Sequence, residues 1–177
     1  MNALIFKIKT FRASPEARAD LFIKQFGIKA GFGCRFFGKV DFGSEPYLIS
    51  LGNQVMISDD VRFSTHDGGM QVLNNMGLLE NADSFGTIEI GNNVFIGMRA
   101  LILKGVKIGD NVVVGAGSIV TKTLPSNSVY AGIPARRICS IDEYYKKALP
   151  KVDETYGFSP ALKKSYLMTK FDGKRTE

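Results

Sequence analysis

The chain contains a single histidine, His66, and the residues around it make it a candidate for proton transfer. An imidazole gains and loses a proton near neutral pH, so it is well suited to act as a general base. Ser64 and Thr65 precede it, and the segment 67–86 that follows is rich in Gly and Asn and lacks periodicity. Loops of that length inside compact domains are often functional. We therefore expect His66 to stand at the head of a functional loop.

A histidine that acts as a base needs a group that orients its second ring nitrogen. The local carboxylates in the sequence are Asp67, Glu80, Asp83 and Glu89. Asp67 is adjacent to His66, so it is the candidate partner, and a role in a loop turn is the alternative for its side chain.

The cysteines and the histidine are too few and too scattered for a metal site. Cys34 and Cys139 lie far apart without the paired spacing of metal ligands, and one histidine cannot supply a three-histidine site. We therefore predict no metal. Cys34 falls at an inward position of the repeat described next, so we expect it to pack in the core rather than to act in redox chemistry.

A repeat of six residues indicates the elements that must position these groups. Aliphatic residues recur at Ile90, Ile96, Ile102, Ile108, Val114 and Val120, and four of them precede Gly91, Gly97, Gly109 and Gly115. A second register, offset by four, is small or aliphatic: Val94, Ala100, Val106, Val112 and Ser118. A helix would spread such a period around its surface, whereas short extended steps with a bend after each bring every sixth side chain inward. Gly and Asn suit the bend because they tolerate positive φ. The repeat therefore predicts an all-β solenoid of parallel strands, a β-helix.

The repeat divides the chain into a coil with attachments at both ends. Hexads begin at Ile28, slip near 43–46, resume at Leu51 and run to about residue 123, which amounts to about four or five three-sided coils. We predict an N-terminal strand or helix cap over 1–27, with a short helix over 14–26; a coil over 28–135, with the loop 67–86 extruded from it; and a helical extension over 136–177. Periodicity alone favours right-handed crossovers.

Charge and composition narrow the classes of partner and the compartment. The net charge is +6, and residues 122–177 hold 11 Lys or Arg against 6 Asp or Glu, so this part suits an anionic ligand. The basic residues are scattered and not interleaved with stacking aromatics, which argues against nucleic acid. The first residues alternate apolar and charged types, and no stretch approaches the roughly 20 apolar residues of a spanning helix. We expect a soluble, cytoplasmic protein without membrane insertion.

The run IGNNVFIGMRALILKGVKIGDNVVVGAGSIVTKTLPSNSVYAGIPARRI resembles the C-terminal part of hexapeptide-repeat acetyltransferases such as galactoside and maltose acetyltransferases. The stretches FGSEPYLISLG and FSTHDGG also resemble acyltransferases of capsule and lipopolysaccharide biosynthesis. The resemblance covers residues 28–145. It implies a left-handed β-helix, a homotrimer with active sites between neighbouring subunits, and acetyl-CoA as the acyl donor.

The same resemblance assigns roles to individual residues. Met98 and Ala116 match positions that line the groove for the pantetheine arm of the cofactor. At the nucleotide end of the cofactor, the matching residues are Thr121 and Lys122. Near the phosphates of the cofactor, they are Arg136 and Arg137. The charge of these residues agrees with that assignment, because Lys and Arg make strong charge-assisted contacts with phosphate.

Acetyl transfer from a thioester to a hydroxyl requires removal of a proton, and the resemblance assigns that step to His66. Because Cys34 is inward and the sequence shows no Ser/His/Asp arrangement, we expect direct attack without an acyl-enzyme. The predicted function is O-acetylation of a sugar, a glycan or a glycan precursor. N-acetylation of an amino sugar nucleotide and O-acetylation of an antibiotic are the alternatives among enzymes. A non-catalytic trimeric scaffold is the alternative outside that class, and it predicts no affinity for CoA.

Overall fold

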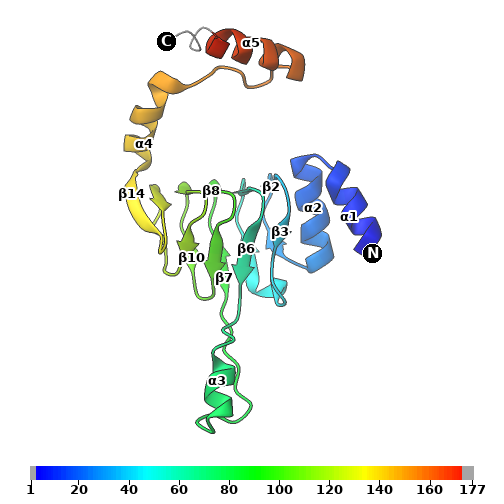
Figure 1. Cartoon of the computed structure of the whole chain (residues 1–177), viewed down its shortest axis with the longest axis vertical. Coiled ribbons are helices and arrows are strands. Elements are labelled where there is room, and N and C mark those ends of the chain that lie inside the picture. The colour runs from blue at the N-terminus through cyan, green and yellow to red at the C-terminus, as the bar shows by residue number, and fades with distance from the viewer. Residues whose placement is uncertain (1–2, 173–177) are drawn as a thin grey trace. The chain divides into compact units, whose positions relative to one another are not determined.

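The computed structural model describes residues 3–172 and contains two compact units, the first ending at Tyr144 and the second beginning at Tyr145 (Figure 1). The first unit contains three sheets, which we call A, B and C. Sheet A holds β1 (Lys29–Ala30), β4 (Ile49–Leu51), β7 (Ile88–Ile90) and β10 (Lys107–Ile108). Sheet B holds β2 (Arg35–Phe36), β5 (Met56–Ile57), β8 (Val94–Ile96), β11 (Val112–Val114), β13 (Ser128–Ala131) and β14 (Arg136–Ser140). Sheet C holds β3 (Val40–Asp41), β6 (Val61–Ser64), β9 (Leu101–Leu103) and β12 (Ile119–Val120).

From β1 to β12, consecutive strands enter sheets A, B and C in turn, so the chain winds as a three-sided coil. Each strand in this run pairs in parallel with the strand three places along, as Val94 on β8 pairs with Val112 on β11. The prediction of parallel strands is therefore confirmed. The exception is β14, which runs antiparallel to β13. The predicted helical extension thus begins with a strand, because residues from Arg136 onward complete the edge of sheet B before any helix starts.

The interior of the coil is filled by the two predicted registers. All their residues between Ile90 and Val120 are buried, with an exposed fraction of at most 4%. Burying a large aliphatic side chain contributes about 1.5–3 kcal/mol, so this column is the main source of stability. Cys34 is buried as well, which confirms its place in the core, and desolvation raises the pKa of its thiol.

At the bends, Asn residues and the glycines that directly follow the aliphatic residues of the hexads serve different purposes. Asn93 and Asn111 have φ of 53° and 55°, and their amides form a ladder in which Asn93 Nδ2 donates to Asn111 Oδ1 at 2.8 Å and Asn111 Nδ2 donates to Asn127 Oδ1 at 2.9 Å. Gly97 lies outside the set with positive φ. A Cβ atom there would lie 2.5 Å from the backbone nitrogen of Ala116 on the next coil. Positive φ at the bends is confirmed for Asn93 and Asn111 but does not explain Gly97, whose role is to let adjacent coils approach.

Two helices cover the N-terminal end of the coil, α1 (Ala3–Arg12) and α2 (Pro15–Phe26). Ser14 caps α2 by accepting a hydrogen bond from the backbone N–H of Ala17 at 3.2 Å. Phe22 on α2 is buried, with its ring centroid 5.0 Å from that of Phe6 on α1 and 6.0 Å from that of Phe36 on β2. Phe6 therefore holds α1 against α2.

Residues 66–86, which we call the arm, leave the coil between β6 and β7. The arm contains a short helix, α3 (Met70–Asn75), whereas the sequence predicts a loop without structure of its own. Asn74 explains the helix in part, because its amide donates to Ala82 O and accepts from Ala82 N at 2.9 and 3.0 Å, which folds the arm back on itself. Figure 1 shows the arm projecting from the coil with α3 at its far end.

The remaining helical segments are a 3₁₀ turn at Pro46–Leu48, α4 (Ile141–Ala148), a 3₁₀ turn at Leu149–Lys151 and α5 (Pro160–Asp172). Ser140 and Glu143 form a capping box at the start of α4, in which Ser140 Oγ accepts from Glu143 N at 3.1 Å and Glu143 Oε2 accepts from Ser140 N at 2.7 Å. In the second unit, Tyr166 of α5 donates to Asp153 at 2.8 Å. None of the described helices is both long and apolar enough to cross a bilayer.

Candidate active site

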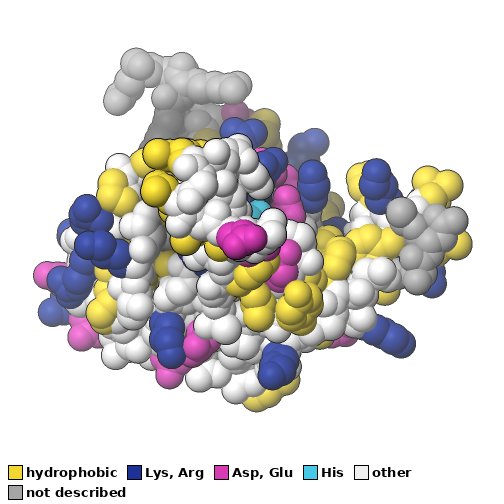
Figure 2. All heavy atoms as spheres, turned by 90° about the horizontal axis from the view of Figure 1, so that it is seen from below, with side chains coloured by type: hydrophobic (Ala, Val, Ile, Leu, Met, Phe, Trp, Pro, Cys, Tyr) yellow, Lys and Arg dark blue, Asp and Glu magenta, His cyan; other side chains and the backbone are white. Residues whose placement is uncertain are grey.

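His66 lies directly after β6, where the arm leaves the coil. The two ends of the arm are joined by backbone hydrogen bonds, from Gly86 N to Thr65 O and from Asp67 N to Ser84 O, both at 2.9 Å. The His66 side chain is 45% exposed, so its ring is accessible to a substrate. The histidine of the chain is visible in the surface view of this side of the molecule (Figure 2).

The carboxylate that contacts His66 is Glu45, which the sequence analysis did not single out for this role. Glu45 Oε2 lies 3.1 Å from His66 Nδ1 and accepts a hydrogen bond from Thr65 Oγ1 at 2.8 Å. Ser44 Oγ lies 3.5 Å from the same ring nitrogen. The hydrogen bond from Thr65 is the main cause that holds the pKa of Glu45 below its ordinary value, and those from Ser44 and His66 add to it. Glu45 is therefore ionised at neutral pH.

The contact with Glu45 fixes which nitrogen of His66 is free to accept a proton. An ionised carboxylate only accepts hydrogen bonds, so Nδ1 carries the hydrogen in the contact with Glu45. In a neutral imidazole the lone pair then lies on Nε2. This arrangement, in which one ring nitrogen donates to a carboxylate and the other is a free acceptor, is that of a histidine general base.

Asp67, the partner expected from the sequence, is engaged elsewhere. Its Oδ1 accepts from Gly69 N at 3.0 Å, and its Oδ2 lies 3.7 Å from Lys104 Nζ. In the part of the chain that the structure describes, no hydrogen bond or ion pair joins Asp67 to His66. The assignment of Asp67 as the orienting group is therefore wrong, because its carboxylate closes the first turn of the arm.

Lys104 connects the two ends of the arm. Its ammonium donates to both Ser84 Oγ and Ser84 O, the latter at 3.4 Å, and it pairs with Asp67. In the next residue, Phe85, the ring centroid lies 6.3 Å from that of His66, and the two rings meet edge to face. Both ends of the arm thus contact Lys104, which directly follows β9, and these contacts hold the backbone of His66 in place.

Glu45 could have been located from the sequence by combining two of its signals. The hexad register slips at residues 43–46, so a bend of unusual shape is expected there. That bend joins sheets C and A one coil before the bend that carries His66. In a coil of this kind, bends between the same two sheets stack about 4.8 Å apart, which brings a carboxylate in one within reach of a side chain in the next.

The residues predicted to bind the cofactor form two groups on either side of sheet C. One group lies at the bends where the strands of the sheet begin and the other at the bends where they end, and we call these two sides the edges of sheet C. Met98 and Ala116 lie in successive bends between sheets B and C, where Gly117 N donates to Met98 O at 2.8 Å. Arg136 follows on this side, because the backbone N–H of the preceding residue, Ala135, donates to Ile119 O at 2.8 Å.

The second group lies at the other edge of sheet C. Thr121 and Lys122 directly follow β12, just as His66 closely follows β6 in the same sheet. Arg137 belongs to neither group, since its Nε donates to Ser128 Oγ at 3.1 Å within sheet B. A single chain therefore does not bring all of the predicted residues together.

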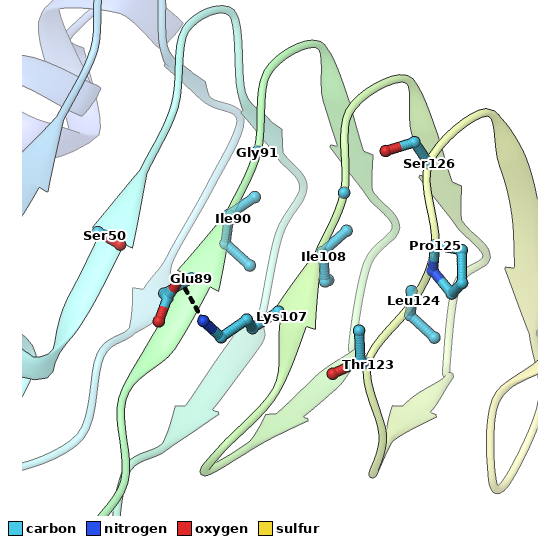
Figure 3. Close-up of a pocket in the computed structure, with 11 residues that line it drawn as sticks. Ser50, Glu89, Ile90, Gly91, Lys107, Ile108, Thr123, Leu124, Pro125 and Ser126 are labelled. Carbon is cyan, nitrogen blue, oxygen red and sulfur yellow. Dashed lines mark ion pairs between the residues drawn. The ribbon is translucent and has the colours of Figure 1, made fainter.

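A groove of about 400 Å³ on the outer face of sheet A lies beside this second group (Figure 3). Thr123, the residue after Lys122, lines it, and Glu89 forms an ion pair with Lys107 at 3.1 Å on its floor. Glu89 is thus engaged with Lys107 rather than with the imidazole. His66 does not line this groove.

Comparisons with known proteins agree with the repeat. The family model described as bacterial transferase hexapeptide (six repeats) matches residues 87–122. The chain is 47% identical over 155 residues to Protein CapG of Staphylococcus aureus, covering 86% of this chain and 89% of CapG. Among solved structures, a maltose O-acetyltransferase from Clostridium difficile 630 is 31% identical with a TM-score of 0.57, covering 77% of this chain and 81% of that one. A galactoside acetyltransferase in complex with coenzyme A is 29% identical with a TM-score of 0.51, covering 81% of this chain and 82% of that one.

Proposed function

Because this chain belongs to the family of bacterial transferases built on hexapeptide repeats, we propose that it transfers an acetyl group from acetyl-CoA to a hydroxyl of a sugar, a glycan or a glycan precursor, with His66 as the general base. The observation that carries the proposed mechanism is the 3.1 Å contact between His66 Nδ1 and Glu45, which leaves Nε2 free to accept a proton. The relatives named as maltose and galactoside acetyltransferases support a sugar as the acceptor.

The proposed reaction is a direct transfer. His66 Nε2 takes the proton from the acceptor hydroxyl while the hydroxyl oxygen attacks the thioester carbonyl. The carbon–sulfur bond then breaks, and the imidazolium returns the proton to the departing CoA thiolate. Glu45 stabilises the imidazolium between these steps by ion pairing with Nδ1. Cys34 does not serve as a nucleophile in this scheme, because its thiol is buried in the core.

We further propose that the active site forms between copies of the chain in a homotrimer. The edge of sheet C with His66 and Lys122 in one copy would face the edge with Ala116 and Arg136 in the next. The outer side of sheet C supports this arrangement, because Leu101 and Ile119 are register partners there and only half-buried in the single chain. A left-handed coil and a cytoplasmic location complete the proposal, on the basis of the family resemblance.

The function is tested by following free thiol released from acetyl-CoA in the presence of panels of hydroxyl and amino acceptors. We expect release with sugar hydroxyls and a rise in thermal stability when CoA is added, since a ligand that binds only the folded state stabilises it. Absence of both would favour a non-catalytic scaffold. Faster release with amino sugars than with hydroxyl acceptors would favour the N-acetyltransferase alternative.

Replacing Glu45 by Gln is expected to lower kcat by about 10- to 100-fold, with little change in the KM for acetyl-CoA. An amide can still accept from Nδ1 but carries no charge to stabilise the imidazolium. Because the pKa of Glu45 is lowered from its ordinary 4.5, the carboxylate interactions are complete above pH 4.5 and are lost as the pH falls through the lowered value. The loss of activity in the variant is therefore expected throughout the neutral range.

The matched control for Glu45→Gln is Asp67→Asn, which tests the partner expected from sequence. The pH-dependent kcat of both variants is measured in the same thiol-release assay. A change of less than about threefold for Asp67→Asn is expected, because its carboxylate does not contact the ring. If Asp67→Asn were the more damaging change, the assignment of Glu45 would be wrong.

A further inference from the structure

Helix α1 has an exposed apolar row. The side chains of Leu4, Ile5, Ile8 and Phe11 are 65, 48, 51 and 86% exposed. Residues 4, 8 and 11 follow the spacing of one face of a helix. Phe6 faces the other way and packs against Phe22 and Phe26. The row is therefore separate from the contact that holds α1 in place.

A groove lies beside this row, between the two N-terminal helices and the first coils. Its volume is about 730 Å³, and five phenylalanines are among its lining residues, including Phe11, Phe26 and Phe37. Its charged lining residues are Lys7, Arg18 and Lys39 together with one carboxylate, Asp59. The groove thus extends the apolar surface of α1 onto the first coil and combines it with ammonium groups. We call α1 together with this groove the N-terminal face.

Basic side chains outnumber acidic ones in the N-terminal part of the chain. Residues 1–40 hold eight Lys or Arg and two Asp or Glu, whereas residues 41–121 hold four Lys or Arg and nine Asp or Glu. Lys7, Lys9 and Arg12 on α1 are all exposed. Arg18 differs from them, because its guanidinium donates to the backbone oxygens of Thr10, Ala13 and Phe36 and holds the helices in place. Figure 2 shows hydrophobic and basic side chains side by side at the right, where Figure 1 places α1.

We propose that the N-terminal face docks on a membrane surface that contains anionic lipid. The apolar row enters the boundary between headgroups and acyl chains, and the flanking Lys and Arg side chains contact lipid phosphates. Charge favours this partner over a second copy of the chain placed face to face, because two such surfaces would bring like charges together. The binding is peripheral: α1 has ten residues and lies on the bilayer rather than across it.

The proposal is tested by sedimentation of the full chain with vesicles of phosphatidylcholine alone and of phosphatidylcholine mixed with phosphatidylglycerol. We expect binding to the mixed vesicles, little binding to phosphatidylcholine alone, and release as salt is raised. The double variant Ile8→Asn with Phe11→Asn is expected to lower the partition coefficient at least about tenfold, because it removes two apolar anchors. The charge variant Lys9→Glu with Arg12→Glu is expected to lower binding by a similar factor. It tests the proposal independently if the first variant folds poorly.

Tyr156→Asn is the matched control, because Tyr156 is 98% exposed and lies in the second unit. It is expected to bind vesicles as the unchanged chain does. Thiol release with a soluble acceptor should be the same in all variants, so a failure of lipid binding is separable from a failure of the proposed catalysis. Absence of binding to mixed vesicles, or equal binding by the N-terminal variants, would overturn the proposal. If the unchanged chain does not bind lipid and the N-terminal variants form smaller oligomers, the N-terminal face is instead a contact with a second copy of the chain.

Discussion

Replacing His66 by Ala is expected to lower kcat for a sugar hydroxyl by about 10²- to 10⁴-fold, the usual contribution of a general base. A hydroxyl keeps its proton at neutral pH, so its oxygen is a poor nucleophile until the imidazole takes that proton. The binding of CoA should change little, because no cofactor contact is assigned to this ring. The measurement is kcat by thiol release, with CoA affinity followed separately by thermal shift.

The same variant separates O-acetylation from N-acetylation. An amine can lose its proton before it attacks, so the loss for an amino acceptor is expected to be much smaller than for a hydroxyl. Glu45→Gln should show the same preference in weaker form, because it acts through the imidazole. An activity of His66→Ala within a few-fold of the unchanged chain toward the best hydroxyl acceptor would remove His66 from the mechanism.

Mixing two inactive variants is expected to restore activity if the site lies between subunits. Ala116→Trp would fill the proposed cofactor groove, and Ala116 is exposed, so the larger side chain does not enter the core. In trimers assembled at random from Ala116→Trp and His66→Ala chains, about one quarter of the sites receive an intact residue from each side. Activity should therefore rise from near zero to about a quarter of the normal value.

The control for this experiment uses two variants that damage the same edge of sheet C. His66 and Glu45 contact each other within one chain, so mixing His66→Ala with Glu45→Gln cannot produce an intact site. The mixture should show only the average of the two separate activities. If the mixture of Ala116→Trp and His66→Ala shows no recovery of activity, the complete site lies within one chain, contrary to the proposed trimer.

Periodicity predicts the coil well because every hexad meets the same physical requirement. Ile96 and Val114 must be inward for the same reason, so the pattern repeats and can be recognised without a structure. The interior positions of the coil are accordingly confirmed by their burial. His66 is recognisable for the opposite reason, since it is the one imidazole in the chain.

The contacts of His66 are less accessible to sequence reasoning. Glu45 reaches the imidazole across two stacked bends, so its contact depends on a register slip whose exact shape is not encoded in a repeat. Asp67 is nearer in the sequence but points toward Lys104, because a side chain adjacent along the backbone need not share a direction with its neighbour. The glycines show the same limit: Gly97 is needed for the approach of Ala116, a contact between coils rather than a local preference.

The way the arm joins the coil has a consequence for how this segment can evolve. Gly86 N and Thr65 O are hydrogen-bonded across the junction, and β7 then pairs with β4 as if nothing had been inserted. The intervening segment can therefore be shortened, lengthened or exchanged without altering the register of the scaffold. Such a junction allows the arm to diversify at a single insertion point while the coil stays constant, and it offers a natural boundary for grafting segments between homologous proteins.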